Sequence, residues 1–181
     1  MIIDTHTHIG VLPPFYMTAD MLLGSMERYG IDFSLVSNIE GAENDHRGDP
    51  VPKEWQTPQN ELLRRTLAVA RKAPQKLGVL PWLRIRQELP DDEFVRIIKE
   101  NRALIYGFKL HPFHSRTAPD DARLEPVYAL AAELGLPVGM PSTTVSRQVP
   151  GDTWGSVLGN STLSPTRVTP FKPGHSRNNL P

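Results

Sequence analysis

An alternation of short apolar runs with segments of helical period extends from residue 2 to residue 140 and limits the folds open to this chain. Such alternation is typical of repeated βα units, in which parallel strands are joined by crossover helices. The runs that we expect to be strands are residues 2–8, 33–37, 77–83, 105–111 and 137–140. The sequence therefore predicts an α/β fold of about five βα units around an open, curved parallel sheet.

The segments between these runs have apolar stripes at helical spacing. Thr18 can cap a first helix that ends at Gly30, and its expected inner face is Met21, Leu22, Met26 and Tyr29. Further helices are expected at residues 60–72, from the acidic group 91–93 to about residue 102, and at 124–134. Their expected inner faces are Leu63, Leu67 and Ala70, then Phe94, Ile97 and Ile98, then Val127, Leu130, Ala131 and Leu134.

The 181-residue chain is long enough for one ordinary domain but short of the roughly 250 residues of a complete eight-fold α/β barrel. After Met140 the composition shifts to proline, serine, threonine and glycine, with Asp152 as the one acid. We therefore expect a folded unit over 1–140 and an irregular tail over 141–181. The long polar segment 38–58 is expected to be either a functional lid or disordered.

Charge and composition exclude several classes of protein. Basic and acidic residues balance, which gives no general attraction for nucleic acid or for an anionic membrane. The chain has no cysteine, so disulfides, thiolate metal sites and cysteine nucleophiles are excluded. No run approaches the ~20 apolar residues of a membrane span. The expectation is a cytoplasmic protein without nucleic-acid or membrane partners.

The first expected strand carries two histidines, His6 and His8, separated by one residue. Because side chains alternate across a strand, Asp4, His6 and His8 should point the same way, and the two imidazoles could reach one ion. Gly10 stands where the strand is expected to turn into a loop. Neutral imidazole suits zinc, manganese or iron. The alternative is a histidine pair that is accidental or that binds metal only as a surface pair.

The strand expected at 105–111 places Gly107, Lys109 and His111 on one face. A lysine and a histidine at the C-terminal end of a strand are costly to bury without partners. Two interpretations stay open. Both side chains belong to a functional site, or the lysine extends its amine to water while the histidine is held by a structural hydrogen bond.

Three segments, residues 3–8, 107–112 and 124–138, resemble the amidohydrolase superfamily, in particular the amidohydrolase-related branch that contains aminocarboxymuconate-semialdehyde decarboxylase-like proteins. The resemblance implies a partial (β/α)₈ TIM-type barrel with a divalent metal at its C-terminal mouth. His6 and His8 match the family's metal-binding pair, with zinc as the first expectation and manganese or iron as alternatives. Lys109 and His111 match a strand motif that faces the mouth, and we expect them to be the catalytic residues.

The chain departs from the family pattern after Met140. Residues 141–144 read Pro-Ser-Thr-Thr where the family has a ligand histidine, and no strand-eight aspartate is present. His175 lies in the tail and matches nothing in the family. We therefore expect a chain that is truncated or frameshifted after Met140, with natural shortening or divergence as the alternative.

The expected function is metal-dependent hydrolysis of a C–N, lactone or ester bond in a small molecule, or a related decarboxylation, impaired in this chain because ligands are missing. Metal-activated water would be the common chemistry. One alternative is a non-catalytic fragment or scaffold that forms a homo-oligomer through its open sheet edge. Another is a TatD-like metal-dependent nuclease.

Overall fold

The computed structural model describes residues 1–45, 48–86 and 88–140. Contacts divide the chain into Met1–Val145 and Ser146–Pro181, and every described residue belongs to the first unit. The expected irregular tail, the departure from the family pattern after Met140 and His175 therefore lie outside the described residues.

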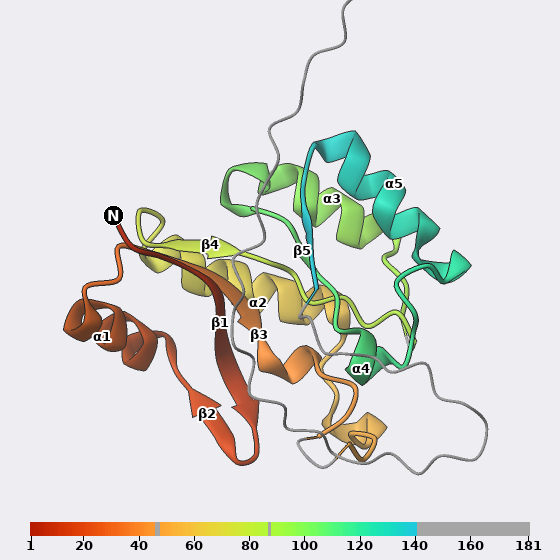
Figure 1. Cartoon of the computed structure of the whole chain (residues 1–181), viewed down its shortest axis with the longest axis horizontal. Coiled ribbons are helices and arrows are strands. Elements are labelled where there is room, and N and C mark those ends of the chain that lie inside the picture. The colour runs from red at the N-terminus through yellow and green to blue at the C-terminus, as the bar shows by residue number, and fades with distance from the viewer. Residues whose placement is uncertain (46–47, 87, 141–181) are drawn as a thin grey trace, which may run out of the picture. The chain divides into compact units, whose positions relative to one another are not determined.

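The structure has a parallel sheet in two parts (Figure 1). The first part has the strand order β2-β1-β3-β4, and the second pairs β5 with β6. The parallel strands are β1 (Ile3–Leu12), β3 (Phe33–Asn38), β4 (Leu77–Val79), β5 (Phe108–Lys109) and β6 (Val138–Gly139). Parallel bridges from Val79 to Ile105 and from Trp82 to Lys109 connect the two parts. Consecutive parallel strands thus lie side by side, as in a partial α/β barrel, and this confirms the predicted fold class.

The strand boundaries differ from the prediction. β1 does not end at His8 but continues to Leu12, with Gly10 inside it at a φ of 101°. A Cβ on Gly10 would lie 2.2 Å from Asn38 Oδ1, so this glycine permits close contact with the neighbouring strand rather than ending its own. β4 and β6 are shorter than expected, because Pro81 and Pro137 cannot donate to a strand ladder. β5 is also shorter and covers only Phe108–Lys109.

A hairpin strand was missed. β2 (Phe15–Met17) pairs antiparallel with Gly10–Leu12 of β1 across a tight turn at Pro13 and Pro14. No alternation of apolar and polar residues marks so short a strand, so pattern reasoning had nothing to detect. β2 covers one end of β1 and leaves the rest of that edge without a described partner strand.

The predicted helices are present as α1 (Ala19–Tyr29), α2 (Gln59–Lys72), α3 (Asp92–Glu100) and α5 (Glu125–Leu134). Thr18 caps α1, since its Oγ1 accepts the N–H of Met21 at 3.2 Å, and Gly30 ends the helix in the left-handed conformation at φ 66°. The buried face of α1 is narrower than predicted. Leu22 is buried together with Met26, whereas Tyr29 is 66% exposed.

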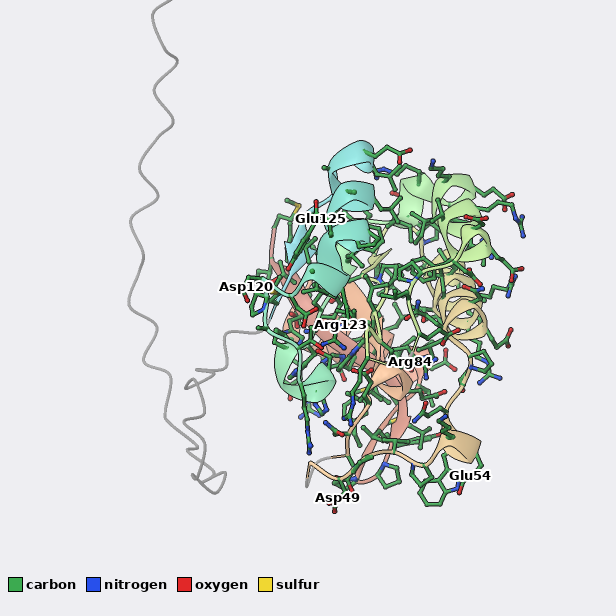
Figure 2. The ribbon with its side chains drawn as sticks, turned by 90° about the vertical axis from the view of Figure 1, so that its right-hand side faces the viewer. Asp49, Glu54, Arg84, Asp120, Arg123 and Glu125 are labelled. Atoms are coloured by element: carbon green, nitrogen blue, oxygen red, sulfur yellow. The ribbon has the colours of Figure 1, made fainter. Side chains whose placement is uncertain are left out.

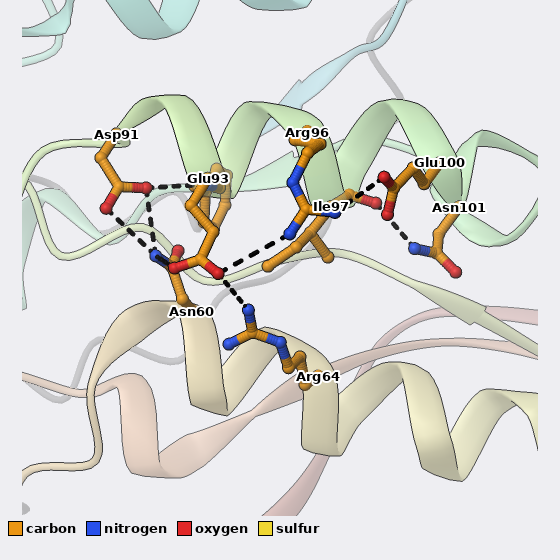
Figure 3. Close-up of polar contacts among 9 residues, drawn as sticks. Asn60, Arg64, Asp91, Glu93, Arg96, Ile97, Glu100 and Asn101 are labelled. Carbon is orange, nitrogen blue, oxygen red and sulfur yellow. Dashed lines mark hydrogen bonds and ion pairs between the residues drawn. The ribbon is translucent and has the colours of Figure 1, made fainter.

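Helices α2 and α3 lie side by side and pack through apolar side chains that include Leu63, Leu67, Phe94 and Ile98. A polar network runs along the exposed side of this contact (Figure 3). Its donors are Asn60 and Arg64 from α2, its acceptors are Asp91 and Glu93 at the start of α3, and Arg96 joins it from the next turn.

The described part of the segment 38–58 is structured and partly buried rather than an extended, exposed loop. It contains the short turns η1 (Ile39–Gly41) and η2 (Lys53–Trp55), and Glu43 and Asn44 within it are buried. The Asn44 side-chain amide donates to the His114 carbonyl at 2.8 Å, which ties the segment to the short helix α4 (Pro112–Ser115). No helix among the described residues has the length and apolarity to cross a bilayer.

Candidate metal and substrate site

His6 and His8 come together in the middle of β1. Their Nε2 atoms are 3.1 Å apart, and their rings meet edge to face with centroids 4.9 Å apart. Asp4 does not join them through a side-chain contact, because its Oδ1 accepts the backbone N–H of His6 at 2.9 Å. The pairing of β1 with β3 is irregular between Asp4 and Thr7, so the simple alternation of faces breaks at this point.

Hydrogen bonds orient the two imidazoles toward one another. His8 Nδ1 lies 3.4 Å from the Ser37 carbonyl, to which an Nδ1–H can donate, and this tautomer leaves the lone pair on Nε2. His6 Nε2 accepts from Lys109, whose Nζ is 2.6 Å away. The Nε2 atoms of the two rings are 3.1 Å apart, but the single lone pair on His6 Nε2 is directed to the Lys109 amine. Binding of an ion between the two rings therefore requires this amine to leave His6 Nε2.

Lys109 is buried in the wall of this site, with 4% of its surface exposed. Burial disfavours the charged amine and lowers its pKa from 10.5 to about 8. Among the described residues no carboxylate forms an ion pair with Lys109. Its amine instead contacts the imidazole of His6. The amine can thus give or take a proton beside His6 near neutral pH.

Trp82 connects the predicted site residues. Its ring is 5.6 Å from that of His8 and is stacked on His111 at 5.5 Å with an interplanar angle of 7°. The amine of Lys109 lies 5.7 Å from the same ring. Sequence reasoning placed Trp82 only at the end of a strand.

The histidines around Trp82 are held neutral. Burial, followed by the charge of Lys109, lowers the pKa of His8 from 6.5 to about 4. For His111, burial and then the neighbouring His114 lower the pKa to about 3. The rings of His111 and His114 are 4.2 Å apart. Neutral imidazoles keep the lone pairs that metal ions and substrate hydrogens require.

A pocket of about 270 Å³ opens beside this group. The residues that line it are Thr5, His6, Leu35, Leu80, Tyr106, Lys109, Pro137, Val138, Gly139 and Met140. His6 and Lys109 therefore reach the pocket directly, whereas His8 and His111 are not part of its lining. The volume suits a small molecule whose polar end meets the histidine and the lysine.

The histidine pair fits a metal ion only in part. Two imidazole nitrogens bound to one zinc ion at its usual bond length lie roughly 2.9–3.4 Å apart. The 3.1 Å separation of the Nε2 atoms falls within that range. However, the described residues contain no group of three His, Asp or Glu side chains placed to hold an ion together. His6 and His8 could thus supply two ligands, and the part of the chain that is described supplies no third carboxylate or imidazole.

Arg84 is a buried charge that pattern reasoning missed. The side chain, labelled in Figure 2, is 2% exposed. Its guanidinium Nη2 donates to the Thr57 carbonyl at 2.5 Å and to Glu88 at 2.9 Å. Its backbone N–H donates to the side chain of Gln59. The sequence signal for this buried charge is the position of Arg84 between two apolar residues, Leu83 and Ile85. These bonds fasten the start of α2 to the chain that follows β4.

Comparison with solved structures shows the fold. The 5-carboxyvanillate decarboxylase of Novosphingobium aromaticivorans is 11% identical, with a TM-score of 0.58 over 76% of this chain and 49% of that one. A putative amidohydrolase from Staphylococcus aureus is 12% identical, with a TM-score of 0.56 over 77% and 46%. The IDCase of Metarhizium anisopliae is 15% identical, with a TM-score of 0.54 over 77% and 50%. The chain spans about half the length of these proteins.

No curated protein matches the chain at a significant level. The family profile described as Amidohydrolase matches residues 3–169, which includes every residue of the site described above and continues past Met140. Because this match covers most of the sequence, the chain belongs to the amidohydrolase family.

Proposed function

We propose that this chain is an amidohydrolase-type enzyme that uses a divalent metal to hydrolyse or decarboxylate a small molecule. The observation that carries the proposal is the pair of Nε2 atoms of His6 and His8, 3.1 Å apart, with the Lys109 amine 2.6 Å from His6. Lys109 ends β5, and His8 is next to Ile9, the last residue of β1 that pairs with β3. The carboxyl ends of parallel strands are where α/β barrel enzymes keep their chemistry. Membership of the amidohydrolase family supports the same interpretation.

In this proposal His6 and His8 would hold the ion through their Nε2 atoms, once the Lys109 amine releases its hydrogen bond to His6. Such an ion, when bound, lowers the pKa of a water ligand toward about 7 and polarises a carbonyl group. Zinc is our first choice, with manganese or iron as alternatives. Manganese gains support from the Novosphingobium decarboxylase, whose structure contains bound manganese.

Lys109 and His111 have separate roles in the proposal. Lys109 lines the pocket, and its Nζ can transfer a proton to a leaving group or hydrogen-bond a substrate carboxylate. His111 is stacked on Trp82, and the Trp82 ring lies 5.7 Å from the Lys109 amine. In the proposal His111 therefore helps to position Lys109 through Trp82. The apolar lining from Leu35, Leu80 and Val138 favours a substrate with an apolar or aromatic body.

Low turnover is part of the proposal. Catalytic zinc usually has three protein ligands and a water, and the described residues provide two histidines. The same observation favours the second candidate, a non-catalytic scaffold that keeps the fold without the reaction. The nuclease alternative gains no support, since none of the three solved relatives described above is a nuclease.

Metal content and turnover can be measured together. Equilibrium dialysis against zinc and against manganese should give at most one bound ion per chain, and His6→Ala with His8→Ala should remove it. His175→Ala is the matched control for loss of a histidine outside the pair. Turnover is assayed with lactone, ester, amide and aromatic carboxylate substrates.

Metal bound through the pair, with turnover that depends on it and falls in Lys109→Met, supports the enzyme. Stoichiometric metal without turnover of any substrate class supports the scaffold. Equal metal binding by the wild type and the double histidine variant contradicts the proposed site.

A further inference from the structure

Tyr106 forms one wall of the pocket beside His6 and Lys109. Its ring lies against the backbone of Gly78 in β4, where an added Cβ would be 2.5 Å from Tyr106 Cδ2. A side chain at this position would therefore displace the ring, and the glycine gives the ring its place on the sheet. Phe33 of β3 contacts the same ring, with centroids 5.2 Å apart and planes at 53°. Backbone and a neighbouring aromatic side chain thus fix the ring on one side.

The other side of the Tyr106 ring faces the pocket. Tyr106 is 44% exposed even though Gly78 lies against one side of its ring. Leu35, which is paired with Gly78 in the register of β3 and β4, lines the same pocket, and so does Leu80. A flat aromatic face beside aliphatic side chains is a surface on which a second ring can stack. The wall therefore offers a ring-shaped ligand more than a generally apolar environment.

Lys109 supplies a charge in the same pocket. Tyr106 and Lys109 belong to one segment of the chain, three residues apart, so their Cα atoms are separated by at most about 11 Å. Among the described residues that line the pocket, Lys109 is the one lysine or arginine, and none is a carboxylate. The amine thus favours an anionic group, and the ring of Tyr106 is close enough to meet the body of the same small molecule.

We propose that Tyr106 is a specificity-determining residue of this site and selects carboxylates with a flat ring. The ring of the ligand stacks on Tyr106 while Lys109 binds the carboxylate. This inference deepens the proposed function and rests on it for the role of the pocket, but it concerns recognition alone and needs no metal. Stacking of two rings contributes about two- to tenfold in affinity beyond the area that the rings bury. The site should therefore distinguish a planar ring from a saturated ring of similar size.

The test compares the binding of benzoate and cyclohexanecarboxylate, which have the same charge and a similar size. Titrations followed by NMR are carried out on the full chain with a chelator present, so the result depends on neither metal nor turnover. The wild type should bind benzoate about two- to tenfold more tightly. Tyr106→Phe should keep this ratio of affinities, whereas Tyr106→Leu should bring it close to one. Tyr29→Leu, at an exposed position of α1, is the matched control and should keep the ratio.

Two further variants separate the wall from the charge. Gly78→Ala keeps the tyrosine but displaces its ring, so it should lower the ratio as Tyr106→Leu does. Lys109→Met should weaken both ligands by a similar factor, because each carboxylate loses its cation. Circular dichroism checks that all variants fold.

Equal affinity of the wild type for the two ligands overturns the proposal, as does a preference for benzoate that survives Tyr106→Leu. Absence of binding of either ligand at about 10 mM, or unchanged binding of both in Lys109→Met, also overturns it. A chain that binds no metal and turns nothing over contradicts the proposed function but not the ratio of affinities, so the two failures are distinguishable.

Discussion

The metal-free protein should lose stability in mild acid because of His8 and His111. Both have a folded-state pKa far below 6.5, at about 4 and about 3, because burial disfavours their charged forms. In the unfolded chain both protonate near pH 6.5. As the pH falls through 6.5, the unfolded state binds protons first. The stability that is present above pH 6.5 is therefore lost progressively down to the folded pKa values.

The size of the effect follows from these shifts. Between pH 7 and pH 5, each histidine remains neutral in the fold while its unfolded counterpart becomes charged, which costs about 2 kcal/mol per residue. Together they account for about 4 kcal/mol, a large share of the 5–15 kcal/mol that is usual for a domain.

Urea unfolding with a chelator at pH 7 and pH 5 measures this loss. His8→Asn and His111→Asn should each reduce the difference between the two pH values by about 2 kcal/mol, since the substituted side chain does not titrate. Tyr16→Phe, at an exposed position of β2, is the control and should keep the full difference. If both histidine variants lose as much stability in acid as the wild type, the two imidazoles are not held neutral in the fold.

Two further predictions concern α3. Asp91→Ala should lower the free energy of unfolding by about 1 kcal/mol, because Asp91 accepts the Phe94 N–H at 2.7 Å as the N-cap, whereas Asp92→Ala in the first turn should cost less. Equal losses in the two variants would remove the capping role. Phe94→Ala should cost about 3–5 kcal/mol in the same chemical denaturation assay, because the ring is completely buried between α3 and α2. A loss below about 1 kcal/mol would mean that the core closes around the gap.

Local signals predicted the helices well. Thr18 and Gly30 marked both ends of α1 because a capping hydroxyl and a left-handed glycine act within a few residues of sequence. Exposure was harder to predict. Tyr29 follows the apolar period of α1, yet it is 66% exposed, and only the tertiary arrangement determines how far burial extends along the helix.

Strand pairing and the site were predicted less completely. The spacing of His6 and His8 was enough to expect their imidazoles to lie close, because it depends on one strand alone. The contact between Lys109 and His6 joins residues 103 positions apart, so it required the order of the strands. Trp82 could not be assigned to the site from sequence, since an apolar residue at the end of a strand is ordinary in any core.

The β1–β2 hairpin also affects how the chain behaves at high concentration. A long, flat strand edge can recruit further chains without limit, as in fibrils whose repeating segments have about six or seven residues. β2 occupies Gly10–Leu12 at one end of β1, and the irregular pairing between Asp4 and Thr7 interrupts the remainder. β6 offers an edge of only two residues, Val138–Gly139. Within the part of the chain that the structure describes, growth by strand addition therefore has no long regular edge from which to start.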